Sequence, residues 1–140
     1  MLAMMQRRDD TRTTEGAEPC LIVAPAGRQR RLRRLCGLLR GAGWRVQVVA
    51  DAQAALAACR RRMPRLMLVA ADGDPGLDLL RRLARLPGRE RCTVFALADA
   101  PDAMQLGRMV VAGAADCISP AIDAEVLRVK LRQARLRHVL

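Results

Sequence analysis

The sequence predicts a single α/β domain in which helices wrap a parallel sheet of five strands. Short apolar runs alternate five times with segments of helical periodicity, and turn residues separate them. The third run, LMLVA at Leu66–Ala70, is apolar almost throughout, as expected of a strand that is covered on both faces. A chain of 140 residues is long enough for one such domain with its own core.

The predicted strands are short segments rich in Val, Leu, Ile and Cys. They lie at residues 20–24, 45–50, 66–70, 92–97 and 115–118. Their alternation with helical segments favours parallel pairing. Residues 1–18 carry charges, Thr and Gly without either periodicity, so we predict a flexible N-terminal tail followed by one domain at residues 19–140.

Each helix is predicted from one apolar face. In chain order these faces are Leu32, Leu35, Cys36 and Leu39; Ala55, Leu56 and Cys59; Leu80 and Leu83; Leu106, Met109 and Val110; and Leu127, Leu131 and Ala134. Asp51 and Asp123 are placed to cap the second and fifth helices, and Asp102 follows Pro101 near the start of the fourth. Five such units, about 120 residues, fit a flavodoxin-like, doubly wound sheet with strand order 2-1-3-4-5.

The charge and the cysteines exclude several function classes. The net charge of +11 could attract acidic proteins, nucleic acid or anionic membranes, although an arginine-rich composition alone could also produce it. Five widely spaced cysteines and a single histidine, His138, favour neither a disulfide framework nor a metal site. No signal peptide or membrane span is visible, so we predict a cytoplasmic protein without a membrane partner.

The loop AADGDPG after the third strand holds two carboxylates, Asp72 and Asp74. In a doubly wound sheet, ligands bind beyond the carboxyl ends of the strands, so this loop lies where chemistry would occur. DGDPG is also the composition of a turn, in which Asp accepts local backbone hydrogen bonds. We favour the turn over a phosphate-accepting role.

Three segments, in this order and spacing, resemble the CheY-like receiver domain of two-component response regulators. They are PRLMLVA before the third loop, GLDLLRRLARL after it and GAADCISPAID at the fifth strand. The resemblance implies a domain that phosphorylates itself on an aspartate at the end of the third strand. It also implies two carboxylates that hold Mg²⁺, and a hydroxyl, an aromatic ring and a lysine on later loops and strands.

At each position where the resemblance implies this chemistry, the chain holds a residue that cannot perform it. The acidic pair falls at Ala24 and Pro25, the acceptor at Ala70, the hydroxyl at Ala98, the aromatic at Cys117 and the lysine at Pro120. A shift in alignment would not help the acidic pair, because no Asp or Glu occurs from Leu21 to Ala50. We therefore expect no catalytic residue, no metal site and no cofactor.

These observations predict a degenerate receiver, or pseudo-receiver, that acts as a regulatory protein-interaction module in bacterial signal transduction and is not an enzyme. The resemblance implies a surface for an effector domain or a second copy at Arg108, Val111, Asp116, Arg128 and Arg132. It implies a surface for a histidine kinase at Arg30, Arg33 and Arg34. Two alternatives stay open: a basic nucleic-acid-binding regulator, and a residual phospho-switch that uses Asp72.

Overall fold

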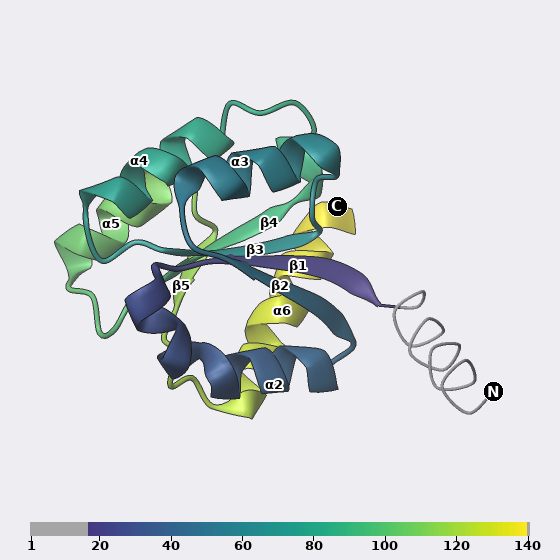
Figure 1. Ribbon diagram of the computed structural model, residues 1–140. Helices are drawn as coiled ribbons and strands as arrows, with labels where there is room; N and C mark the ends of the chain where they lie inside the picture. The colour runs from purple at the N-terminus through teal and green to yellow at the C-terminus, as the bar shows by residue number, and fades with distance from the viewer. Residues whose placement is uncertain (1–16, 140) are drawn as a thin grey trace.

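The protein is a five-stranded parallel sheet in the order β2-β1-β3-β4-β5, which confirms the predicted fold (Figure 1). The computed structural model describes residues 17–139, with side chains up to Ala134. The strands are β1 (Glu18–Val23), β2 (Trp44–Val49), β3 (Leu66–Ala70), β4 (Thr93–Leu97) and β5 (Asp116–Ile118). The helices are η1 (Ala26–Leu32), α2 (Arg33–Gly41), α3 (Ala52–Arg61), α4 (Asp74–Leu83), η2 (Arg89–Arg91), α5 (Ala103–Val111) and α6 (Ala124–Val139), where η marks a 3-10 helix.

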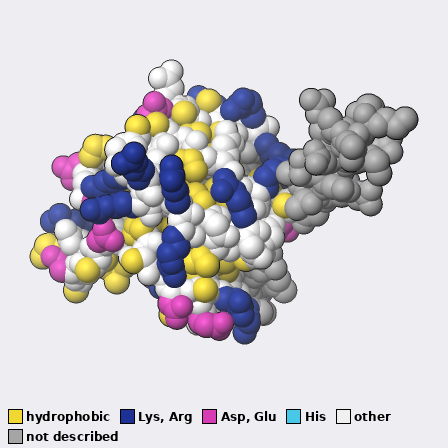
Figure 2. Space-filling model, turned by 60° about the horizontal axis from the view of Figure 1, so that its bottom comes forward, with side chains coloured by type: hydrophobic (Ala, Val, Ile, Leu, Met, Phe, Trp, Pro, Cys, Tyr) yellow, Lys and Arg dark blue, Asp and Glu magenta, His cyan; other side chains and the backbone are white. Residues whose placement is uncertain are grey.

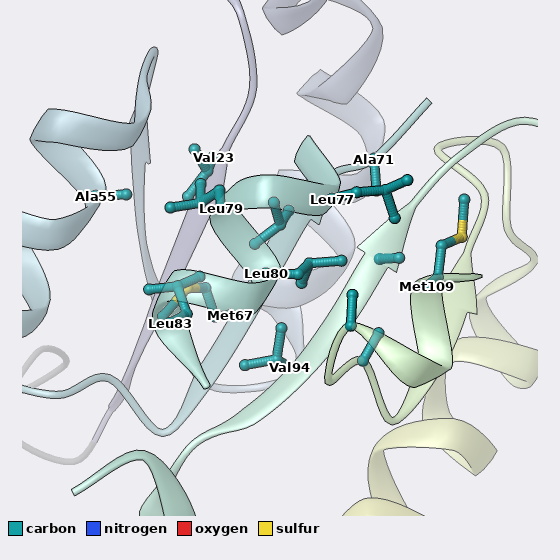
Figure 3. Close-up of a cluster of buried hydrophobic side chains, with 14 of the residues drawn as sticks. Val23, Ala55, Met67, Ala71, Leu77, Leu79, Leu80, Leu83, Val94 and Met109 are labelled. Atoms are coloured by element: carbon teal, nitrogen blue, oxygen red, sulfur yellow. The ribbon is translucent and has the colours of Figure 1, made fainter. Parts of the chain in front are cut away.

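Two layers of helices cover the sheet. Figure 1 shows α3, α4 and α5 on one face and η1, α2 and α6 on the other. Successive side chains of a strand point to opposite faces, so Leu21 and Val23 enter the core on the first side while Ile22 enters the core on the second. On the first side, Leu80 and Leu83 of α4 pack near Met67, Val94 and their neighbours (Figure 3).

Two of the predicted caps are present. The Asp51 carboxylate accepts a hydrogen bond from the Ala54 backbone N–H at 2.8 Å. At the start of α5, the Asp102 carboxylate accepts from the Gln105 backbone N–H, and the Gln105 side chain accepts from the Asp102 backbone N–H. This reciprocal pair satisfies two donors that a helix start otherwise leaves open, and it fixes where the loop after β4 ends.

Two predicted assignments, those of Glu18 and Asp74, were wrong. Glu18, assigned to the tail, begins β1 because it pairs with Trp44 of β2. The first helix begins as a 3-10 helix and becomes α-helical only at Arg33. Asp74, assigned to a turn, is the first residue of α4, where its carboxylate suits the positive end of the helix dipole.

The predicted core of the fourth helix was also wrong. Leu106 and Val110 of α5 are 37% and 50% exposed, whereas Met109 is buried. The reason is the position of α5 at the edge of the sheet, over the three-residue strand β5. So short a strand offers little surface to cover, and only one side of α5 reaches the core.

Candidate functional site

The carboxyl ends of β1, β3 and β4 enclose a small hollow that both apolar and charged side chains line. Ala24, Ala70, Ala98 and Pro120 line it, and its volume is about 80 Å³. The sheet hydrogen bonding continues one residue past the strands and fixes these positions: Ala24 donates to the Val49 carbonyl at 3.0 Å, and Ala98 donates to the Ile118 carbonyl at 3.2 Å. The structure therefore brings together four of the six positions that the sequence singled out.

Two ion pairs close the rim of the hollow. Arg28 of η1 pairs with Asp72 after β3, and Arg31 of η1 lies 3.5 Å from the Asp99 carboxylate after β4. The Ser119 hydroxyl donates to the same Asp99 at 3.5 Å. Asp72 and Asp99 thus each face a guanidinium group of η1. Sequence spacing did not reveal this arrangement.

The residues around the hollow do not fit a magnesium ion. Mg²⁺ requires several oxygen ligands, whereas Ala24, Ala70 and Ala98 present only methyl groups. In the part of the chain that the structure describes, no group of three or more His, Cys, Asp or Glu side chains could hold a metal. The two acids that line the hollow, Asp72 and Asp99, face the guanidinium groups of Arg28 and Arg31.

The other two predicted positions lie outside the hollow. Pro25 is exposed, at the residue before η1. Cys117 is half-buried on β5, where its Sγ lies 4.0 Å from the Ala98 carbonyl oxygen. Cys117 therefore touches the end of β4 but adds no reactive group to the rim, since burial raises the pKa of its thiol and the nearby Asp116 raises it further.

Comparisons with solved structures agree with the fold. No family model and no curated protein matches the sequence. Among solved structures, the receiver domain of NtrX from Brucella abortus has a TM-score of 0.69 and 26% identity, over 82% of this chain and 96% of that chain. A CheY-like receiver domain protein from Methanospirillum hungatei has a TM-score of 0.73 and 18% identity, over 87% and 96%. The chain has the fold of a response regulator receiver domain.

The receiver fold in these matches occurs both alone and as part of a longer chain. A longer NtrX structure from Brucella abortus has a TM-score of 0.73 and 25% identity over 87% of this chain, which spans only 27% of that NtrX chain. Among the helices of the described residues, none has both the length and the apolar character that a membrane crossing needs.

On this receiver fold, the apolar side chains left uncovered gather beside β5. The large hydrophobic residues that are exposed in the described chain all lie on α5 and α6: Met104, Leu106, Val110, Val111, Val126 and Val129. We call the surface formed by these residues, together with Asp116 of β5 and Lys130 of α6, the α5–β5–α6 face. Val111, predicted to be exposed, is 89% exposed.

An ion pair joins the middle of the α5–β5–α6 face. The Lys130 ammonium lies 2.5 Å from the Asp116 carboxylate and 3.3 Å from the Cys117 carbonyl. The Lys130 side chain thereby links α6 to β5, the short strand at the edge of the sheet. Sequence reasoning selected Asp116 but missed Lys130, Val126 and Val129; two valines on the otherwise polar side of the last helix were the signal that could have revealed them.

The predicted interface arginines divide into separate groups. Arg108 is exposed on α5, whereas Arg128 and Arg132 lie on the other side of α6, facing α2. On the first helical segment, Arg30 and Arg33 are exposed, and no ion pair involves them in the described residues. Those two arginines thus keep free guanidinium groups on the surface.

Arg34 has a structural role. Its guanidinium donates to the Ile122 carbonyl at 2.6 Å and ties α2 to the loop before α6. It is therefore a weaker candidate for partner contact than Arg30 or Arg33.

Because several thiols are buried, we expect the free energy of unfolding to depend on pH. Burial raises the pKa of the Cys92 thiol from 9.0 to about 12, and burial is also the main cause that raises the pKa of Cys20. Above pH 9 the unfolded chain loses thiol protons that the folded chain keeps, so the free energy of unfolding should fall as pH rises toward 12. For one thiol the slope is at most about 1.4 kcal/mol per pH unit.

Urea unfolding at about pH 8 and about pH 10 measures this effect. The urea midpoint should be lower at the higher pH, and Cys92→Val should make the difference smaller. Equal midpoints for the wild-type chain at the two pH values would show that these thiols titrate alike in the folded and unfolded states.

Proposed function

We propose that the chain is a receiver-fold module that takes no phosphoryl group and acts by binding another protein through the α5–β5–α6 face. The observation that carries this proposal is the gathering of exposed apolar side chains on α5 and α6. Uncovered apolar surface costs free energy in water, and where it concentrates on neighbouring elements it commonly marks a protein interface. On this proposal the module is not an enzyme, and its partner is an effector domain, a histidine kinase or a second copy of the chain.

The alanine-lined hollow supports the absence of phosphoryl chemistry. Phosphoryl transfer depends on positioning a nucleophile and on neutralising charge at the transferring group. A methyl group at Ala70 cannot accept a phosphoryl group, and Ala24 and Ala98 cannot bind its metal ion or its oxygens. The five free thiols suit a reducing compartment, so we place the module in the cytosol.

The experiment that tests this part is incubation with acetyl phosphate and Mg²⁺, followed by intact-mass measurement. We expect no phosphoryl adduct on the wild-type chain or on Asp72→Asn. An adduct that the wild-type chain forms and Asp72→Asn lacks would establish a residual phospho-switch at Asp72. The Arg28 pair speaks against that role, because it already holds the carboxylate.

Nucleic-acid binding is the second candidate, and the basic surface favours it. Figure 2 shows Lys and Arg side chains spread over the side of the molecule that carries α2 and α6. Arg30, Arg33 and Arg40 surround a shallow hollow beside β2. Titration with duplex DNA at increasing salt tests this candidate: binding through phosphates would weaken steeply as salt rises. If DNA does not bind even at low salt, this candidate fails.

A further inference from the structure

A groove runs between α2 and α6 on the face of the molecule opposite α3 and α4. Its volume is about 610 Å³. Trp44 and Leu127 lie in its floor and are 8% and 2% exposed. Along α2 the wall is low, because Gly37, Gly41 and Ala42 form it, and along α6 the rim carries Arg128 and Arg132.

The glycines leave this groove open. A Cβ added at Gly37 or at Gly41 would meet nothing within 4 Å, so no neighbouring side chain occupies the space above them. Low walls of this kind allow another backbone to approach closely, as when a helix lies lengthwise in a groove. The groove is thus shaped for a helix that brings its own apolar side chains.

The charges around the groove determine what kind of helix fits. Two arginines of α6, Arg128 and Arg132, line the groove, and no acid lines it. On α6, Arg132 makes no ion pair among the described residues, and Arg128 pairs only with the exposed Glu125 of its own helix, at 3.4 Å. An incoming helix flanked by carboxylates would neutralise this rim, whereas a basic helix would be repelled.

We propose that the α2–α6 groove binds an amphipathic helix of a partner protein whose apolar face is bordered by Asp and Glu. Eight of the ten residues that line the groove are Gly, Ala, Leu or Trp, and such a lining favours a protein helix over nucleic acid. The groove is separate from the α5–β5–α6 face, since its rim lies on the opposite side of α6. The inference therefore does not depend on the proposed function of that face.

Trp44 is the single tryptophan of the chain, so its fluorescence reports directly on the groove. The probe is a synthetic peptide of about 18 residues with Leu on one face, Glu along both flanks and no Trp or Tyr. Full-length protein is titrated with this peptide, with a version in which Lys replaces every Glu, and with a duplex DNA. We expect saturable binding of the Glu peptide with a change in Trp44 emission, and at least tenfold weaker binding of the Lys peptide.

Two variants test the groove, and each has a matched control. Gly37→Leu should fill the groove without a clash, and Arg132→Glu should reverse its rim charge; each should weaken the Glu peptide about tenfold or more. Gly27→Leu is the control for the first, because a Cβ there also meets nothing within 4 Å but Gly27 does not line the groove. Arg60→Glu on α3 makes the same charge change on the opposite layer. Both controls should bind the peptide as the wild-type chain does.

Several outcomes would overturn the inference. They are equal binding of the Glu and Lys peptides, unchanged binding to Gly37→Leu, or a Trp44 response to DNA that matches the response to the Glu peptide. Tighter peptide binding after deletion of residues 1–16 would assign the groove to the chain's own N-terminal segment. Loss of peptide binding in Val111→Arg, with Gly37→Leu unaffected, would move the site to the α5–β5–α6 face.

Discussion

Val111→Arg is expected to remove most binding of the protein partner while leaving the fold intact. Val111 is 89% exposed, so the substitution should change the free energy of unfolding by less than about 0.5 kcal/mol. In a complex that covers the α5–β5–α6 face, the new guanidinium would be buried without a partner. Burying an unpaired charge costs about 3 kcal/mol or more, which corresponds to at least about a hundredfold loss of affinity.

This loss is measured by capturing proteins from native cytosol on immobilised wild-type and variant protein. Mass spectrometry then quantifies the captured proteins. Sedimentation velocity over a range of concentrations covers the case in which the partner is a second copy. Ala57→Arg is the matched control, because Ala57 is exposed on α3 and gains the same charge. Proteins retained equally by all three chains would show that the α5–β5–α6 face does not bind them.

Among alanine substitutions of the glycines that the structure describes, Gly76→Ala is expected to cause the largest loss of stability. Gly76 lies in the first turn of α4, directly against the end of β3. A Cβ there would lie 2.0 Å from the Ala70 carbonyl oxygen and 2.7 Å from the Ala71 Cα. Both contacts are with backbone atoms, so the helix start or the strand end must move. We expect a cost of about 3 kcal/mol or more, at the upper end of overpacking effects.

Gly73→Ala is the control for this substitution. Gly73 precedes α4 with extended backbone, and its added Cβ would lie 3.7 Å from the Pro75 ring. This variant should lose less than about 1 kcal/mol. Urea unfolding of both variants, at unchanged slope, gives the difference. A Gly76→Ala midpoint equal to that of the wild-type chain would contradict the close approach of α4 to β3.

The sheet and its order were predictable because each strand and each helix carries its own periodic signal. The caps at Asp51 and Asp102 were predictable for the same reason, since a cap is a local interaction. The exposure of Leu106 and Val110 was not predictable. Helical spacing reports that a face is apolar, but it does not report whether the sheet extends far enough to cover that face. Here β5 is three residues long, and Met109 is the single buried residue of α5.

The candidate site likewise had features that the sequence could predict and features that it could not. The resemblance to receiver domains implied that Ala24, Ala70 and Ala98 replace functional side chains, and their meeting at one edge followed from the parallel sheet. The pairing of Arg28 with Asp72 did not follow, because those residues are 44 positions apart and belong to different loops. The Lys130–Asp116 pair was missed for a similar reason. Contacts between loops depend on side-chain reach, which sequence periodicity does not encode.

The measurement that tests the central claim most directly is quantitative capture of partner protein with and without acetyl phosphate and Mg²⁺. A module that binds through the α5–β5–α6 face and takes no phosphoryl group should retain the same proteins in the same amounts under both conditions. It should lose them in Val111→Arg under both. Retention that changes with acetyl phosphate in the wild-type chain, but not in Asp72→Asn, would contradict this account and show that a phosphoryl switch controls the interface.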